Sequence, residues 1–235
     1  MASFRKEILG QIERIDTGRI FTFRDLSFET EKTANVAVLL SEQSRKGILV
    51  RVEKGAYYRP KKSVLGHGKL PVYQDEQFRY LTEKLNGYIT GAYVYNKMGL
   101  TEQVATTITI ATPNPVRRFR FKNLDIECVK AYCMDYPDES LVPYLRLLDA
   151  IKDMKRIPGT TGQDIYNRVK SQYFNGYSLP ELEKIVSLAK SYPPRVRKVV
   201  ADILGDIRQT VLQTEMAKTI LPTTRFNLDY QVYET

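Results

Sequence analysis

The sequence predicts an α+β protein that is mostly helical. Apolar residues recur at intervals of three and four over several long stretches, which is the pattern of helices with one buried face. Shorter stretches alternate apolar and polar residues, which is the pattern of strands. Glycine and proline fall between these stretches and mark their ends. The chain has 235 residues, enough for one large domain or two small ones.

The first predicted element is a helix that begins near residue 4. Ser3 suits its N-cap, and Gly18 marks the turn that follows the helix. A short strand at residues 20–23 comes next, and Thr22 can then cap a short helix that runs through Leu26. The apolar face of the first helix consists of Phe4, Ile8, Ile12 and Ile15.

Residues 33–46 show the clearest helical pattern of this region, and we expect the helix to end at Gly47. At 100° per residue the helix has one apolar face and one mixed face. The apolar face, which we expect to be buried, consists of Val36, Leu39, Leu40 and Gln43. The mixed face consists of Ala34, Asn35, Val38, Ser41, Glu42 and Arg45.

A β-hairpin follows this helix. Lys54-Gly55 is a tight-turn signal, residues 56–59 return as the second strand, and Pro60 ends that strand. The period of two places Ile48, Val50 and Val52 on one face of the first strand and Leu49, Arg51 and Glu53 on the other.

The predicted elements follow the order of a winged helix-turn-helix: helix, short strand, short helix, longer helix and hairpin. In such a domain the third helix presents its outer face to the major groove and the hairpin flanks the DNA backbone. Asn35 can bond adenine through two hydrogen bonds, and Val38 can contact a thymine methyl group, whereas Glu42 opposes DNA binding unless it accepts from a cytosine amino group. A small α+β domain with no DNA role is the alternative. The predicted DNA-binding residues are Lys32, Thr33, Asn35, Val38, Arg45, Arg51, Lys54, Lys61 and Lys62.

The charge distribution also favours a polyanionic partner for the N-terminal part. The chain carries 36 Lys and Arg against 27 Asp and Glu, a net charge of +9. Residues 1–62 hold 13 basic and 8 acidic side chains, whereas residues 131–235 hold 14 and 13. A basic half of this kind is typical of nucleic-acid binding, although net charge also serves solubility alone.

The remainder of the chain reads as a linker at residues 61–68 followed by a second region. We expect helices at residues 75–85 and 88–104, and strand-like segments at 106–112 and 119–129. Tyr88, Tyr93 and Tyr95 could form a stacking surface for nucleic acid bases, but core filling is the commoner use of tyrosine. The last third is predicted to be helical at residues 141–154, 162–173, 179–189 and 195–219, with a late strand at 226–233.

Two segments resemble a known family, the AbiEi-type antitoxins of bacterial type IV (abortive infection) toxin–antitoxin systems. The first is the hairpin sequence 51–60, Arg-Val-Glu-Lys-Gly-Ala-Tyr-Tyr-Arg-Pro. The second combines Gly-Ala-Tyr-Val-Tyr-Asn at 91–96 and Gly-Leu-Thr-Glu-Gln-Val at 99–104 with Ile-Thr-Ile-Ala-Thr at 108–112. The resemblance covers roughly residues 4–130 and leaves the helical third unmatched.

The resemblance implies a protein that is not an enzyme. Members of the family repress their own operon through the winged helix and use the following domain to counter a nucleotidyltransferase-like toxin. We therefore expect a winged-helix DNA-binding domain at 1–62 and an antitoxin-like α+β domain with a helical C-terminal part at 63–235. The expected partners are double-stranded operator DNA and the cognate toxin, which need not form a stable complex.

Catalytic, cofactor and metal motifs are missing from the sequence. It contains no Gly-Ser turn of a nucleotidyltransferase and no phosphate-binding loop. His67, Cys128 and Cys133 are too few and too far apart for zinc, and no long apolar segment or signal peptide is present, so we expect a cytoplasmic protein without cofactor or metal. A winged-helix regulator or protein-interaction module without antitoxin activity remains the alternative, and an enzyme acting on nucleic acid has the least support.

Overall fold

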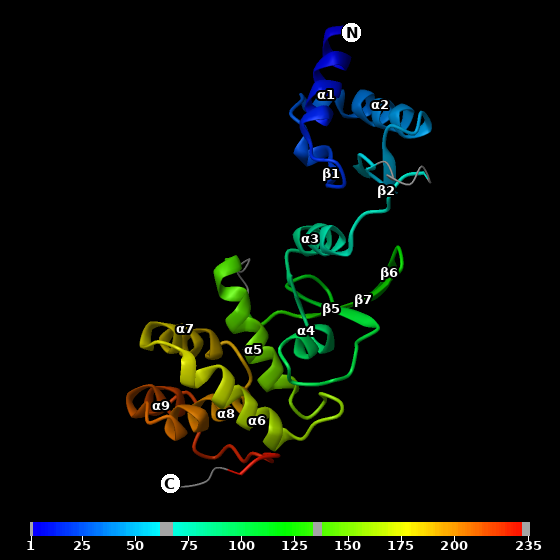
Figure 1. Ribbon diagram of the computed structural model, residues 1–235. Coiled ribbons are helices and arrows are strands. Elements are labelled where there is room, and N and C mark those ends of the chain that lie inside the picture. The colour runs from blue at the N-terminus through cyan, green and yellow to red at the C-terminus, as the bar shows by residue number, and fades with distance from the viewer. Residues whose placement is uncertain (1, 62–67, 134–137, 232–235) are drawn as a thin grey trace. The chain divides into compact units, whose positions relative to one another are not determined.

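The structure is a computed structural model that describes residues 2–61, 68–133 and 138–231 (Figure 1). The chain is a mixed α+β protein in which helical elements account for about half of the residues, so the predicted fold class is confirmed. It forms two compact units, Met1–Lys84 and Leu85–Thr235. The first unit thus extends past residue 62, where we placed the end of the winged helix, and takes in a further helix.

The first unit contains the elements of a winged helix-turn-helix in the predicted order. The short second helix is a 3-10 turn at Phe23–Asp25, in which Thr22 and Asp25 form the predicted capping box. A second 3-10 turn, Thr30–Lys32, leads into the next helix. The helices and strands are α1 (Ala2–Arg14), β1 (Ile20–Thr22), α2 (Thr33–Arg45), β2 (Val50–Glu53), β3 (Ala56–Tyr58) and α3 (Gln74–Leu85).

The core of the first unit lies between α1, α2 and the sheet. The predicted buried face of α2 is confirmed, because Val36, Leu39, Leu40 and Gln43 are all buried. The three strands are antiparallel in the order β1-β3-β2. The buried apolar residues are Ile8, Ile12, Phe21, Leu26, Val36, Leu39, Leu40, Leu49 and Tyr57.

The predicted alternation of the first hairpin strand is wrong at its beginning. Ile48 is 54% exposed, whereas Leu49 is buried. The amides of both residues donate to the carbonyl oxygen of Gln43, at 3.0 and 3.2 Å, so this segment closes the end of α2 instead of joining the sheet. A register shift between Arg51 and Glu53 then also alters the alternation within β2.

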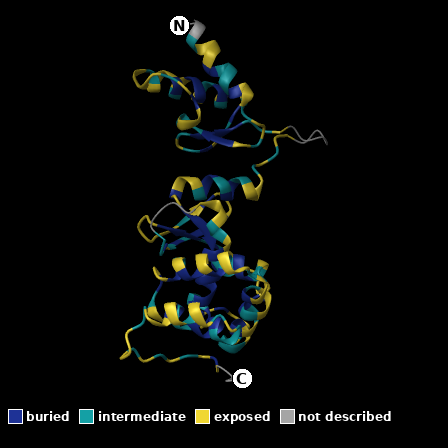
Figure 2. Ribbon diagram, turned by 90° about the vertical axis from the view of Figure 1, so that its left-hand side faces the viewer, coloured by how far each residue is buried: buried dark blue, intermediate teal, exposed yellow. Residues whose placement is uncertain are grey.

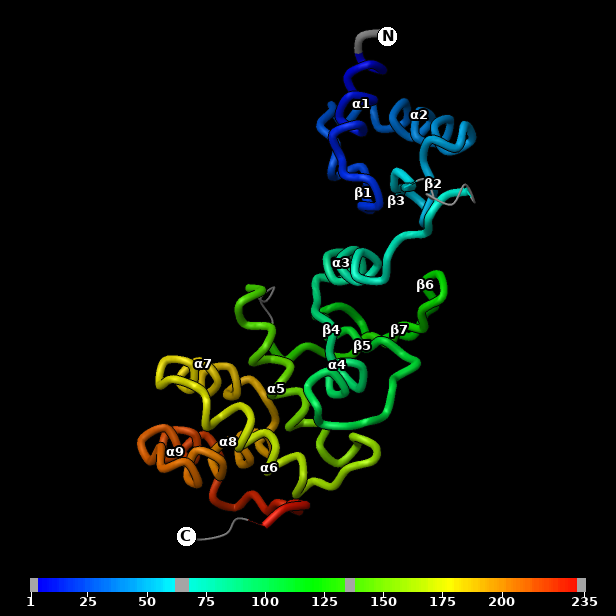
Figure 3. The backbone as a smooth tube through the Cα atoms, viewed as in Figure 1, coloured from blue at the N-terminus to red at the C-terminus, as the bar shows by residue number. Residues whose placement is uncertain are grey.

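The second unit combines a four-stranded sheet with a group of helices (Figures 1 and 3). The strand order is β4-β5-β7-β6, with β5 and β7 parallel and the other pairs antiparallel. Its elements are β4 (Tyr88–Thr90), α4 (Ala92–Lys97), β5 (Thr107–Thr112), β6 (Arg118–Phe121), β7 (Leu124–Lys130), α5 (Val142–Asp153), α6 (Gly162–Gln172), α7 (Leu179–Ala189), α8 (Pro194–Asp206) and α9 (Thr210–Ala217), with 3-10 turns at Glu139–Leu141 and Phe174–Gly176.

The predicted helix at residues 88–104 is wrong in its first part, which is strand β4. Gly91 separates β4 from α4 with φ of 76°, a conformation that favours glycine. A Cβ atom at Gly91 would lie 2.6 Å from Oγ1 of Thr109, so the close approach of β5 also requires glycine there.

Two further predicted elements each divide in two. The segment 119–129 is a hairpin of β6 and β7 whose turn contains Lys122 with φ of 55°. The predicted helix at 195–219 is α8 and α9, separated where Arg208 adopts φ of 62° and the amide of Gln209 donates to the carbonyl of Leu204 at 2.8 Å. In the tail, the described residues 226–231 form no strand.

The core of the second unit is formed mainly by its helices. Figure 2 shows the strands largely buried and the outward faces of the helices exposed. Buried side chains from α5, α6, α7 and α8, among them Leu145, Ile165, Ile185 and Val199, join one continuous apolar cluster. The C-terminal tail contributes Tyr230, whose ring stacks on that of Tyr166 at 4.4 Å between centroids.

Candidate functional site

The outer face of α2 is the first candidate surface. Thr33, Asn35, Val38 and Arg45 are exposed, with Val38 58% exposed although it is apolar. Val38 and Arg45 lie opposite the buried face of the helix and Asn35 lies at the edge of that face, so the packing of the core fixes the direction in which these three project. Thr33 is the first residue of the helix. The Thr33 hydroxyl donates to the carbonyl of Thr30 at 2.6 Å and keeps its lone pairs for an incoming donor.

Lys32, at the beginning of α2, is held by neighbouring side chains. Its ammonium group pairs with Glu29 at 2.7 Å and lies 5.1 Å from the ring centroid of Phe4. The hydrogen bond to Glu29 raises the pKa of Lys32. Lys32, one of the predicted DNA contacts, can therefore bind a phosphate only if the phosphate replaces Glu29 as its partner.

The hairpin presents the second group of predicted residues. Arg51 and Lys54 are exposed, and the Arg51 side chain donates through Nε to the carbonyl of Glu53 at 3.2 Å. Lys61 is exposed, with its ammonium group 5.6 Å from the ring centroid of Tyr73. Lys62, the remaining predicted contact, lies outside the described residues.

Glu42 is neutralised by a residue that the sequence patterns do not reveal. The guanidinium of Arg5 on α1 pairs with the Glu42 carboxylate at 2.7 Å. This hydrogen bond holds the pKa of Glu42 below its ordinary value, so the carboxylate stays charged but compensated. Arg5 lies 37 residues away in sequence, and no local pattern could have identified the pair.

Two more cations lie at the end of α2. Lys46 is exposed at the C-cap, and Lys69 returns to the same place after the linker. A Cβ atom at Gly47 would lie 2.7 Å from Nζ of Lys69, and the amide of Leu70 donates to the carbonyl of Lys61 at 2.9 Å. Arg45, Lys46, Lys54 and Lys69 form no ion pair within the part of the chain that the structure describes. Within its described residues, the first unit therefore combines exposed side chains on α2 with unpaired cations at the end of that helix and on the hairpin.

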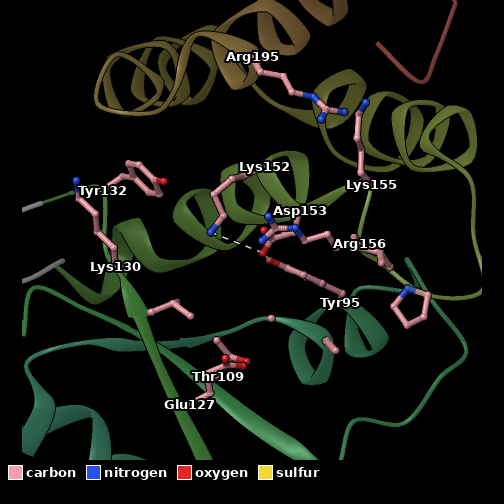
Figure 4. Close-up of a pocket in the computed structure, with 15 residues that line it drawn as sticks. Tyr95, Thr109, Glu127, Lys130, Tyr132, Lys152, Asp153, Lys155, Arg156 and Arg195 are labelled. Carbon is pink, nitrogen blue, oxygen red and sulfur yellow. Dashed lines mark hydrogen bonds and ion pairs between the residues drawn. The ribbon is translucent and has the colours of Figure 1, made fainter. Parts of the chain in front are cut away.

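The second candidate site is a pocket of about 540 Å³ in the second unit (Figure 4). It opens between Gly91 and α4, the strands β5 and β7, the end of α5 and the beginning of α8. Its charged and aromatic lining residues are Tyr95, Glu127, Lys130, Tyr132, Lys152, Asp153, Lys155, Arg156 and Arg195.

A buried polar cluster surrounds Asp149 on the inner side of α5. The hydroxyls of Tyr88 and Thr90 donate to Asp149 at 2.9 Å each, and that of Tyr192 donates at 3.2 Å. Lys152 completes the cluster at 3.3 Å. Burial raises the pKa of Asp149, and it also raises the pKa of Tyr88 and Tyr192.

The tyrosines proposed as a stacking surface serve the fold at two positions. Tyr88 and Tyr95 are buried, and the Tyr95 hydroxyl donates to Asp153 at 2.8 Å. Tyr93 is half-buried with Lys97 over its ring at 4.6 Å. The core-filling interpretation therefore holds for Tyr88 and Tyr95.

The described residues hold no group of three or more His, Cys, Asp and Glu side chains arranged to bind a metal ion. Cys128 is buried and Cys133 is half-buried, both as free thiols, while His67 lies outside the described ranges. No helix in residues 2–61, 68–133 and 138–231 is both long and apolar enough to cross a membrane.

Comparisons with known proteins give little further identification. No known protein family matches the sequence, and no curated protein matches it. Among solved structures, the chain is similar to the crystal structure of the Rv2827c protein from Mycobacterium tuberculosis, with a TM-score of 0.49 and 13% sequence identity. The match covers 94% of this chain and 83% of that chain. At this level of similarity no functional conclusion follows.

Proposed function

We propose that the first unit binds double-stranded operator DNA, with α2 in the major groove and the β2–β3 hairpin against the backbone. The observation that carries the proposal is the division of α2 into a buried face and an exposed face with Asn35 and Val38. Arg45, Lys54 and Lys69, which have no ion-pair partner among the residues that the structure places, suit phosphates around such a helix. The ion pair with Arg5 compensates the charge of the Glu42 carboxylate, which would otherwise repel DNA phosphates on this face.

We further propose that the chain is a cytoplasmic antitoxin of the AbiEi type, which represses its own operon and counters a nucleotidyltransferase-like toxin. This part rests on the resemblance of segments 51–60, 91–96, 99–104 and 108–112 to that family. The second unit then carries the antitoxin activity, without catalysis of its own. Its nearly balanced charge after residue 130 suits a protein target better than DNA.

DNA binding is tested by fluorescence anisotropy with the DNA upstream of the chain's own gene, at several salt concentrations. In the variant Arg45→Ala/Arg51→Ala/Lys54→Ala we expect weaker binding to every sequence. The slope of log affinity against log salt should fall by about one for each lost phosphate contact, because each contact releases counterions.

The matched control is Lys184→Ala/Lys218→Ala/Arg225→Ala, which removes the same charge from exposed positions of the second unit. It should leave the salt slope as in the wild type. Equal affinities of the wild type and the first triple variant in dilute salt would refute the DNA-binding assignment.

The alternative is a protein-interaction module, and exposed Val38 and Ile48 favour it most directly, since apolar side chains in solvent suit a protein partner. Under that alternative neither triple variant alters DNA affinity. Val38→Ser would instead weaken capture of the partner while leaving any DNA affinity unchanged.

A further inference from the structure

We propose that the pocket of the second unit binds a small phosphate ester that also carries hydroxyl groups, such as a sugar phosphate or nucleotide. The pocket measures about 540 Å³. Ligand sites for small molecules commonly span about 300–1,000 Å³. This binding is separate from the proposed DNA and antitoxin functions.

Cations from three separate elements converge on this pocket. Lys130 ends β7, Lys152 lies in the last turn of α5 with Lys155 and Arg156 just beyond it, and Arg195 begins α8. Against these five cations, the pocket lining contains two carboxylates, Glu127 and Asp153. Glu127 is in addition engaged by Arg118 at 2.5 Å, so it offsets less of the positive charge.

Two of the five cations have no anionic partner within residues 68–133 and 138–231. Lys130 and Arg156 form no ion pair there. Lys130 and Lys152 each lie 5.5 Å from the centroid of the Tyr132 ring, so two like charges gather at one aromatic group. Lys152 is paired with Asp149 and Asp153, whereas an anion beside Lys130 would supply the partner that this ammonium group lacks among the described residues.

Arg195 supplies an independent sign of an unfilled site. Its terminal nitrogen pairs with Asp229 at 3.0 Å, and Lys155 pairs with the other oxygen of the same carboxylate at 2.7 Å. Nε of Arg195 is buried and finds no acceptor among the described residues. Buried donors are normally satisfied, so this Nε is available to an acceptor that enters the pocket.

The remaining polar groups of the pocket suit hydroxyls. The Asp153 carboxylate accepts from Tyr95 at 2.8 Å and lies beside Lys152 at 3.6 Å, as the dashed line in Figure 4 shows. A carboxylate oxygen keeps further lone pairs, and Thr109 of β5, which carries a hydroxyl, also lines the pocket. Groups of this kind bind sugar hydroxyls, whereas the cations bind phosphate. Together they favour an ester over free phosphate.

The test is isothermal titration calorimetry of the full chain with three probes: inorganic phosphate, ribose 5-phosphate and ATP. We expect ribose 5-phosphate or ATP to bind more tightly than inorganic phosphate. The variant Lys130→Ala/Arg156→Ala should weaken that binding at least tenfold. Since neither side chain forms an ion pair with another described residue, circular dichroism of the variant should match that of the wild type, and Arg156→Lys should retain part of the affinity.

The control variant Lys184→Ala/Lys218→Ala removes two exposed charges elsewhere in the second unit and should bind the probes as the wild type does. Three results would overturn the proposal. These are a wild type that binds no probe at millimolar concentration, a Lys130→Ala/Arg156→Ala variant with unchanged affinity, and equal affinity for inorganic phosphate and both esters.

Discussion

The outward face of α2 in the first unit carries polar side chains in solvent, whereas α5 in the second unit carries the most deeply buried charged group of the described chain. Thr33, Asn35 and Arg45 project outward from α2. Asp149 of α5 is 1% exposed and accepts from three hydroxyls and a lysine. The two helices should therefore respond differently to substitution. Removing an outward group costs binding to a partner, whereas removing a satisfied buried group costs stability.

The largest expected effect is the loss of stability on substitution of Asp149. Asp149→Ala leaves the hydroxyls of Tyr88 and Thr90 without their acceptor in the core, while Tyr192 can still donate to the carbonyl of Leu145 at 3.3 Å. Breaking a buried charged network of this kind costs about 3–5 kcal/mol of unfolding free energy. Urea unfolding followed by circular dichroism measures it, since the chain has no tryptophan. Hydrogen exchange should place the loss in the second unit.

The matched control for this prediction is Asp125→Ala on the surface of the same unit. Asp125 lies 4.0 Å from Arg120, and both side chains are well exposed. An exposed pair of this kind is worth about 0–1 kcal/mol. If both variants lose the same stability, the buried cluster has no special role and the comparison between the units fails.

The next effect concerns sequence preference in the first unit. Asn35→Ala should reduce the affinity for the operator by about 1–3 kcal/mol and flatten the preference among operator variants, because a two-point contact to adenine is lost. Its side chain is exposed, so the unfolding transition should stay unchanged. Anisotropy with a set of single-base operator variants tests this. A uniform loss across all variants would show that Asn35 reads no base.

The smallest effect concerns the pair of Arg5 and Glu42. Arg5 holds the pKa of Glu42 below its ordinary value of 4.5, so the pair is intact at neutral pH and is lost only as the pH falls through the lowered value. Arg5→Ala should weaken DNA binding modestly at neutral pH, and Glu42→Gln in the same chain should restore part of the affinity. The DNA affinities of the two single variants and the double variant, measured by anisotropy, form a double-mutant cycle for this pair.

An affinity of Arg5→Ala that equals the wild type at neutral pH would mean that α2 does not face the phosphates at this point. A strong pH dependence around neutrality would also contradict the account, because Glu42 is ionised there with or without Arg5.

Local patterns sufficed for α1 and α2 of the first unit because each of these helices buries one face. The three- and four-residue spacing of Val36, Leu39 and Leu40 predicted the orientation of α2, and with it the exposure of Asn35 and Arg45. The pairing of Arg5 with Glu42 and the return of Lys69 to the end of α2 depend on tertiary contacts, which no spacing encodes. The exposure of Ile48 could not be predicted for the same reason, since its amide donates to the carbonyl oxygen of Gln43 near the end of α2.

Longer-range packing decided the parts of the second unit that differ from prediction. Residues 88–90 are an exception, because Tyr88, Ile89 and Thr90 all favour a strand by themselves, and β5 pairs with them. The break between α8 and α9 depends on one residue, Arg208, in a conformation that its side chain does not favour. The pocket draws residues from positions 91 to 195, so its cations could not be grouped from sequence.

One measurement tests the division of roles most directly: growth under induction of the neighbouring toxin, with repression of the operon promoter recorded in the same cells. The chain is supplied as wild type or as Arg45→Ala/Arg51→Ala/Lys54→Ala at equal expression. We expect the triple variant to lose repression and to keep full rescue of growth, because its substitutions lie in the first unit alone. Loss of rescue together with repression, at unchanged protein level, would contradict the assignment of the two activities to separate units.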